Sequence, residues 1–316
     1  MVHILELKTT QAAAIKIVID AINSLLTDAN FDFYPFYMDD SKKDDKYESD
    51  SSDGTSDGNS DVNSDVNSEE ETIVETKEDA NQPKKKTVGG MVLKEVNKTG
   101  KILVYMRLDA DKFDVYKYNY HKKKLTLGID INNLLKCLKC MSHFDTMTWI
   151  VDDEDINKLV IILESNERKE KKTFKLNLMD IEEETYDISP IQFPYSITLP
   201  SQDLHKYCKD MAASTEKIEI KATSNRLFFS GKGGIGNIEF EVGETNGGLS
   251  IVSTTNNTNE IVQGLFELKF LLIFTKCTNL CNQVTLFLKN DYPIIVTYQI
   301  AALGEIKLVL SPSKAD

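Results

Sequence analysis

The chain has 316 residues, of which 41% are hydrophobic and 28% are charged, and its formal net charge is −13. No apolar run approaches the roughly 20 residues of a membrane-spanning helix, and MVHILELK at the start lacks the pattern of a secretory signal. Five cysteines, an odd number in a long chain, argue against a disulfide framework. We therefore expect a soluble intracellular protein that makes no membrane contact, and the chain length favours two domains.

The first predicted element is a helix in TTQAAAIKIVIDAINSLL, residues 9–26. Its apolar residues recur at the spacing of one helical face. They are Ile15, Val18, Ile19, Ile22, Leu25 and Leu26. The strand-like run NFDFYPFYM follows this helix, so we expect the chain to return along a sheet.

An acidic insertion is predicted next, from about 41 to 99. Sixteen carboxylates and four lysines lie between Asp39 and Asn81, so this stretch carries −12 of the net −13. Its Ser-Asp repeat, SDGTSDGNSDVNSDVNSEEE, has little to bury and cannot offset a backbone entropy cost of roughly 1–2 kcal/mol per residue, which predicts disorder. The insertion is either a solvated tether or a regulatory arm that is phosphorylated or bound by a partner.

Three further segments have helical spacing, and β-rich runs separate them. They are INNLLKCLKCM (131–141), PSQDLHKYCKDM (200–211) and FELKFLLIFTKCTNL (266–280). The order of helices and strand meanders occurs twice, which indicates an internal duplication. Residues 181–195 are polar, contain two prolines and form a predicted connector between domains 1–180 and 196–316. We predict an α+β fold with antiparallel sheets and helices on one face.

The second helix contains a C-x-x-C pair, Cys137 and Cys140, with His143 three residues later. A zinc site needs two further ligands at similar spacing, and no second C-x-x-C or H-x₃-H exists. A redox pair would open a helix, whereas this pair lies inside one. We interpret Cys137 as a thiol at the edge of the core and predict no metal, cofactor or catalytic site.

Lysines recur on the polar side of all four predicted helices. Like charges three residues apart destabilise a helix slightly, so one pair alone indicates only a solvated face. Repetition in every helix favours a polyanion facing these surfaces, contacted through its phosphates because no set of side chains suits base edges. The alternative is four ordinary amphipathic helices.

A third motif, SGKGGIGNIEF, has glycines at 231, 233 and 236 in G-x-G-x-x-G spacing. A phosphate-binding loop of this kind requires a helix after the glycines. Strand-like sequence follows here instead, so we predict a glycine-rich hairpin.

Several segments in order resemble the eukaryotic-type DNA sliding clamp, the proliferating cell nuclear antigen family. They are LDADKFDVYKYNYHKKKLTLGIDINNLLKCLKC, KLNLMDIEEE, HKYCKDM, FTKCTNL and PIIVTYQIAALGEIKLVLSP. The resemblance runs from about Ile4 to Pro312 and omits only the acidic insertion. It implies two similar domains per chain in the DNA clamp fold, three chains in a closed ring, and helices that line a hole around duplex DNA.

The resemblance also implies which lysines contact DNA phosphates. The matching positions are Lys16, Lys136, Lys139, Lys206, Lys209, Lys269 and Lys276. Asn23 stands where the family usually has a further lysine. Contact through phosphates alone suits a ring that slides, because such binding is not sequence-specific.

A hydrophobic pocket beneath the connector is implied as well, which receives a short peptide from polymerases, nucleases and ligases. Its matching positions are Met38, Leu103, Tyr186, Ile188, Pro293, Val309 and Pro312. Tyr186 replaces the usual leucine and Val309 replaces a tyrosine, so we expect an altered peptide preference. Because the insertion leaves the chain just after Met38, we expect it beside this pocket.

The resemblance implies a non-enzymatic processivity factor in DNA replication and repair, which forms a homotrimer and requires a clamp loader. Edge strands in 171–179 and 236–242 are candidates for ring closure because their charges are complementary. One alternative is a monomeric or checkpoint-type clamp homologue, in a heteromeric ring or bound to one side of DNA. Another is an enzyme that uses Cys140 or the glycine-rich turn. The expected location is the nucleus, or a cytoplasmic replication site if the source is a large DNA virus.

Overall fold

The computed structural model describes residues 3–38, 87–142, 146–183, 191–234, 236–254 and 260–314. The chain divides into two compact units. The first comprises Met1–Tyr37 and Val88–Asp316, and the second is Met38–Thr87. Only the two end residues of the second unit are described, so the predicted disorder of the acidic insertion lies outside the described residues.

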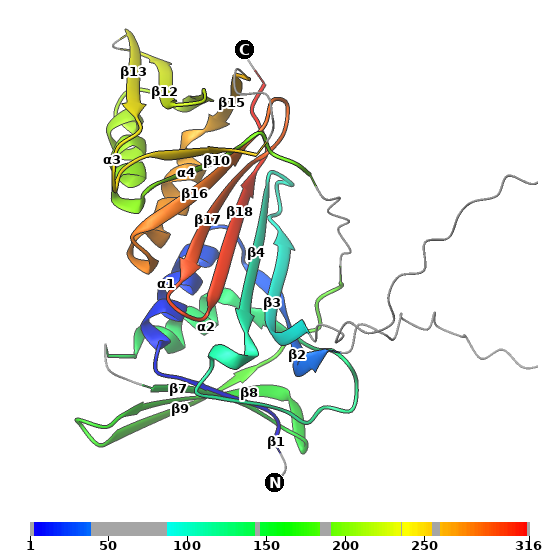
Figure 1. The fold of residues 1–316 in the computed structure, drawn as a ribbon. Helices are drawn as coiled ribbons and strands as arrows, with labels where there is room; N and C mark the ends of the chain where they lie inside the picture. Colours follow the sequence, from blue (N-terminus) through cyan, green and yellow to red (C-terminus); the bar gives the residue numbers. More distant parts are fainter. Residues whose placement is uncertain are drawn as a thin grey trace, which may run out of the picture. The chain divides into compact units, whose positions relative to one another are not determined.

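The order of elements confirms the internal duplication (Figure 1). A strand, a helix, five strands, a second helix and three strands run from β1 to β9, with one short 3-10 turn, η1 (Ala110–Lys112), among them. The same order then repeats from β10 to β18. Each element of the first half therefore has a counterpart in the second: β4 corresponds to β13, β9 to β18, α1 to α3 and α2 to α4.

Three antiparallel sheets contain all the strands of the described residues. The five-stranded sheet has the order β5 (Val115–Tyr118), β1 (His3–Thr9), β7 (Thr146–Asp152), β8 (Asp155–Ser165), β9 (Glu170–Asn177). The four-stranded sheet has the order β13 (Gly236–Gly243), β12 (Arg226–Gly233), β11 (Lys217–Ala222), β15 (Val262–Glu267). The nine-stranded sheet has the order β14 (Ser250–Ser253), β10 (Tyr195–Pro200), β16 (Gln283–Leu288), β17 (Ile294–Ile300), β18 (Gly304–Leu310), β4 (Ile102–Asp109), β3 (Thr87–Val96), β2 (Asp28–Met38), β6 (Leu125–Asp130).

The nine-stranded sheet joins the two halves of the chain. Its first five strands are the second-half counterparts of the five-stranded sheet, and its last four are the first-half counterparts of the four-stranded sheet. The two sets meet where β18 pairs with β4, from Gly304 opposite Leu108 to Leu310 opposite Ile102. We call this contact, with the helices beside it, the seam.

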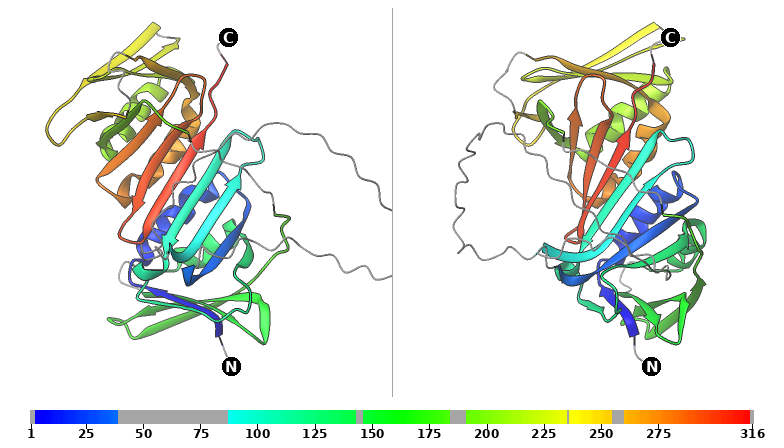
Figure 2. Two further views of the ribbon diagram at one scale, coloured as in Figure 1. Left: turned by 45° about the vertical axis from the view of Figure 1, so that its right-hand side comes forward. Right: turned by 90° about the vertical axis from the view of Figure 1, so that its right-hand side faces the viewer.

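Four α-helices cover one side of the nine-stranded sheet (Figure 2). They are α1 (Ala12–Asn23), α2 (Ile131–Lys139), α3 (Ser201–Ala212) and α4 (Leu268–Phe274). The predicted stripes are buried, as at Ile15, Leu134 and Leu204. The Asp130 carboxylate accepts a hydrogen bond of 2.7 Å from the Asn133 amide and so begins α2, as a helix N-cap does.

The structure corrects two predicted boundaries. Residues 87–96 form β3 and bury Met91 and Leu93, although they were assigned to the insertion. The glycine pair at 89 and 90 belongs to this strand, where a Cβ on Gly89 would lie 1.7 Å from the Pro35 carbonyl oxygen. The fourth predicted helix, 266–280, is α4 followed by a 3-10 segment, η2 (Thr275–Leu280).

Candidate nucleic-acid interface and peptide-binding surface

The four helices form a row in which α2 packs on α1, α1 packs on η2, and η2 packs on α3. The sequence-predicted lysines lie along this row. Lys136, Lys139, Lys206, Lys209, Lys269 and Lys276 are exposed, and Lys16 is half-buried. Because η2 has 3.0 rather than 3.6 residues per turn, the seven-residue spacing of Lys269 and Lys276 does not by itself place them on one side, contrary to the α-helical expectation.

The lysines at the two ends of the row form no ion pair with any described residue. Lys139 on α2, and Lys206 and Lys209 on α3, have no carboxylate within 4 Å there, and Lys136 donates only to the Asn133 side chain, at 3.1 Å. Lys136 and Lys139 also lie in the last turn of α2, where a positive charge interacts favourably with the helix dipole and stabilises the helix. A structural role and a phosphate contact are therefore compatible at these positions.

Lys276 in η2 is held by the neighbouring helix instead. Its Nζ lies 3.6 Å from the Asp20 carboxylate of α1 and donates to Ser24 Oγ at 2.7 Å. A positive charge paired in this way is less available to a phosphate than an unpaired one.

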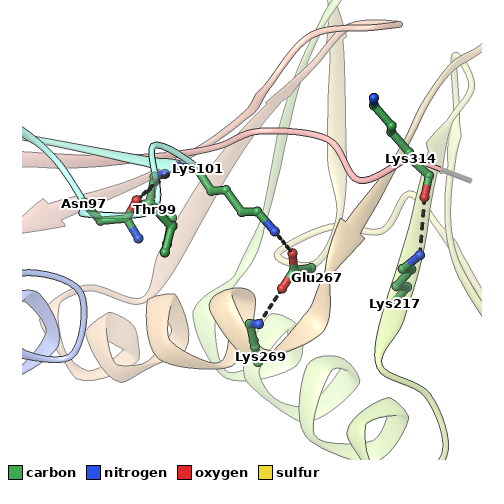
Figure 3. A network of polar contacts seen from close by, with 8 residues as sticks. Asn97, Thr99, Lys101, Lys217, Glu267, Lys269 and Lys314 are labelled. Carbon is green, nitrogen blue, oxygen red and sulfur yellow. Dashed lines mark hydrogen bonds and ion pairs between the residues drawn. The ribbon is translucent and has the colours of Figure 1, made fainter.

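Lys269 belongs to a second charged contact across the seam (Figure 3). Glu267 ends β15 and accepts from Lys269 at 2.6 Å and from Lys101, which lies in the turn between β3 and β4. Only 19% of the Glu267 side chain is exposed. Hydrogen bonds from Lys101 and Lys269 lower the pKa of Glu267, so this carboxylate is charged at neutral pH and neutralises both cations in part.

The C-terminal segment is fastened beside this network. The Ser311 amide donates to the Lys101 carbonyl at 2.9 Å, and the Ser313 amide donates to the Leu265 carbonyl at 2.7 Å. Lys217 Nζ donates to the Lys314 carbonyl at 3.3 Å (Figure 3). Residues 311–314 are thereby held against both halves of the chain.

The face of the nine-stranded sheet opposite the helices carries a row of apolar side chains. Strand pairing places neighbours in this order: Phe287, Ile295, Val309, Leu103 and Val96. All five are partly exposed, whereas the strand neighbours of Phe287, Ile295, Val309 and Leu103 on the helix side are buried. We call this set the outer apolar row.

Two predicted pocket residues, Leu103 and Val309, lie directly opposite each other in the outer apolar row. Pro293 is half-buried one residue before β17, and Pro312 is exposed two residues after β18. Tyr186 and Ile188 lie outside the described residues. Val96 and Ile295 also lie in the outer apolar row but were not among the predicted pocket positions. Val96 fell in the range assigned to the insertion.

The structure does not bring Met38 to this surface. The folded unit ends at Tyr37 and resumes at Val88, where Gly89 meets Pro35. Leu103 pairs with Val96, seven residues along β3 from Gly89, or about 23 Å at 3.3 Å per residue. The chain therefore leaves β2 at the end of β3 opposite to Val96 and Leu103, and the position expected for the insertion stays a prediction.

The two strands named for ring closure both lie at sheet edges. β9 ends the five-stranded sheet and β13 ends the four-stranded sheet. On β9, Lys171 lies 3.4 Å from Glu164 and Lys172 lies 3.7 Å from Glu170, while Lys175 has no ion pair with a described residue. On β13, Glu241 pairs with Arg226, whereas Glu239 has no ion pair with one. Lys175 and Glu239 are thus the best candidates for charges that meet between chains.

The remaining motifs have structural explanations. Burial raises the pKa of the half-buried Cys137 thiol, which disfavours the thiolate that metal binding or redox chemistry needs. His143 lies outside the described residues. The glycine-rich segment is the β12–β13 hairpin, as predicted, and a Cβ on Gly233 would lie 1.5 Å from the Ser214 carbonyl oxygen. Within the described ranges, no cluster of three metal-ligating side chains is found.

No helix in the described part of the chain is long and apolar enough to cross a membrane.

Comparison with known proteins matches both halves of the chain. Residues 70–186 match the N-terminal domain of proliferating cell nuclear antigen, and residues 187–313 match its C-terminal domain. A protein of Acanthamoeba polyphaga mimivirus, described as a probable DNA polymerase sliding clamp, is 26% identical over 313 residues. The aligned region covers 98% of this chain and 62% of the relative, so the chain spans less than two thirds of that relative's length. With two clamp domains of α+β architecture, the chain belongs to the proliferating cell nuclear antigen family.

Proposed function

We propose that the protein is a sliding clamp, a non-enzymatic processivity factor that encircles duplex DNA and holds a DNA polymerase on it. Three copies would close a ring with the row of helices on the inside. A clamp loader would open the ring, and nucleases and ligases with a clamp-binding peptide would use the same platform. The site of action would be the nucleus, or a cytoplasmic replication site of a virus.

The observation that carries this proposal is the pair of free edges left by the duplication. Within the chain, β18 pairs with β4. The counterparts of these two strands are β9 and β13, and both are edges. An exposed edge presents unpaired amide and carbonyl groups that another chain can satisfy. Pairing β9 of one copy with β13 of the next would repeat the seam between chains, and head-to-tail contacts of this kind form rings when the rotation closes.

Light scattering across a dilution series tests the assembly. A mass near three times 35.7 kDa that survives dilution supports the ring, whereas a mass near 35.7 kDa at every concentration would exclude it and favour the monomeric homologue. Topology is tested on duplex DNA with both ends blocked. A closed ring stays on this DNA in high salt and is lost when one end is freed, whereas binding by charge alone is lost in high salt in either case.

We further propose that partner peptides bind at the outer apolar row. Val309 has no ring to cover its side of the row, where the family resemblance leads us to expect a tyrosine. Titration of clamp-binding peptides by fluorescence anisotropy should therefore give a ranking different from that of a clamp with the tyrosine, and Val309→Tyr should shift the ranking back. An unchanged ranking in both proteins would contradict this part of the proposal.

A further inference from the structure

We infer that phosphates of duplex DNA bind chiefly at the junctions between subunits, in a cation cluster that needs two copies of the chain. The cluster consists of Lys136 and Lys139 from α2 of one subunit and Lys206 and Lys209 from α3 of its neighbour. The seam inside each chain contributes less, because Lys276 and Lys269 are paired with carboxylates there. This inference rests on the proposed ring.

The duplication relates the helices residue by residue. α1 and α3 both have 12 residues, and every buried position of α3 falls on a buried position of α1 when Ala12 is matched to Ser201, as Leu204 on Ile15 and Cys208 on Ile19. On this match Asp20 corresponds to Lys209. α2 and α4 match in the same way from their buried first residues, Ile131 and Leu268, which makes Lys139 the counterpart of Lys276.

The helices α2 and α3 stand next to the two free edges. Lys172 on β9 donates to the Cys140 carbonyl at the end of α2, at 2.9 Å. Tyr207 on α3 packs on Phe240 of β13, with ring centroids 6.0 Å apart. A junction that pairs β9 with β13 therefore brings α2 of one subunit towards α3 of the next, as the seam brings η2 to α1.

The charges at the two contacts differ in sign. At the seam, Lys276 meets Asp20 at 3.6 Å. At the junction, the same geometry places Lys209 opposite Lys139 of the partner subunit, so two cations face each other. Bringing like charges together in a junction opposes assembly, and a bound phosphate relieves the repulsion. DNA and ring closure should therefore strengthen each other.

Alanine variants of the full chain separate the contribution of the junction from that of the seam. Duplex binding is followed by anisotropy of a labelled 30-base-pair DNA at several salt concentrations. Lys139→Ala and Lys209→Ala should each weaken binding roughly three- to tenfold at about 100 mM salt and reduce the salt slope by about one. Lys276→Ala should change binding less than about twofold, as should Lys122→Ala, which removes an exposed cation distant from the helices and serves as the control.

A charge exchange makes the sharper test. Lys209→Asp copies the pattern of the seam into the junction, so it should make the trimer persist to lower concentration while it weakens DNA binding. Asp20→Asn releases Lys276 and should tighten DNA binding a few-fold. Circular dichroism of each variant establishes that the fold is retained.

The outcomes distinguish this inference from the proposed function. If the wild-type protein is monomeric throughout, both are overturned. If the wild-type trimer binds DNA but Lys276→Ala weakens binding as much as Lys139→Ala, only the composite cluster is overturned. A Lys209→Asp trimer that dissociates more readily than the wild type would also overturn it, because the two lysines would then not oppose each other.

Discussion

The seam and the two free sheet edges, β9 and β13, are built from corresponding elements. They differ in whether their backbone hydrogen bonds and their charges have partners. At the seam, β18 and β4 pair over seven residues, and the lysines beside them meet Asp20 and Glu267. At the two free edges, β9 and β13 each pair with only one strand of the described residues, and the lysines of α2 and α3 form no ion pair with a described residue. Hydrogen bonds and charges are satisfied where the chain meets itself and are left open where it would meet another copy and a polyanion.

The comparison indicates that a single sheet contact can serve two purposes. Inside the chain it is permanent and its charges are internally balanced. In the proposed ring, the contact between chains would open for DNA to enter, and unbalanced cations there would couple assembly to DNA binding. The predictions below test this difference from the largest expected effect to the smallest.

Removing a buried side chain at the seam should lower the free energy of unfolding more than any other change predicted below. Leu308 is fully buried on the helix side of β18. Leu308→Ala should reduce the free energy of unfolding by about 2–5 kcal/mol, from lost burial and the cavity that remains. Urea denaturation measures this, and Val309→Ala on the opposite face should cost less than about 1.5 kcal/mol. Equal losses of unfolding free energy in the two variants would contradict the burial of the helix side of β18 alone.

Reversing a charge on one of the two edge strands should weaken assembly and leave folding intact. Lys175→Glu or Glu239→Lys should raise the dissociation constant of each contact between subunits about fivefold, since an exposed ion pair contributes at most about 1 kcal/mol. The double variant should recover much of the loss. Sedimentation equilibrium measures the constants, and Lys158→Glu, which alters a half-buried cation on the neighbouring strand β8, should have a smaller effect. If the double variant assembles no better than the single ones, these charges do not meet between chains.

Removing the Glu267 carboxylate should weaken the seam in a pH-dependent way. Its folded pKa is lower than the usual 4.5, so its contribution is fully present above pH 4.5 and disappears as the pH falls through the folded pKa. Glu267→Gln should therefore cost about 1 kcal/mol at pH 7 and almost nothing at the lowest pH at which the chain stays folded. Urea denaturation at several pH values measures the difference. A cost that does not change with pH would indicate lost packing rather than lost charge.

Thiol reactivity should report which helix surfaces are open. Cys140 is exposed at the end of α2, whereas burial raises the pKa of both Cys208 and Cys277 to about 12. A chromogenic thiol reagent at pH 7.5 should therefore modify Cys140 within minutes and the two buried thiols only after denaturation. Rapid modification of Cys208 in the native protein would show that α3 opens locally.

Sequence patterns predicted much of the fold because they record which face of an element is buried. The stripes at Ile15, Leu134 and Leu204 identified their helices, whereas the two edge strands were proposed from the family resemblance and their complementary charges. The patterns failed where local composition and tertiary context disagree. Residues 87–96 resemble the polar, glycine-containing insertion before them, and only pairing with β4 makes them a strand.

The candidate sites, too, were predicted only in part from the sequence. Residue types and spacing were enough to find seven lysines on the helices, because a solvated cationic face has a clear periodicity. Which of those lysines is paired depends on contacts between residues far apart in the chain, such as Lys276 with Asp20 and Lys101 with Glu267. Periodicity within one helix carries no information about the charge on its neighbour.

The sequence by itself determined the α+β class, the duplication and the cationic helices, since each follows from local burial and periodicity. Only the tertiary structure decided that β18 joins β4, that β9 and β13 remain edges, and that Val96 rather than Met38 lies beside Leu103. These are pairings between distant segments, and their free energy comes from a register and a shared core that exist only when both partners are in place.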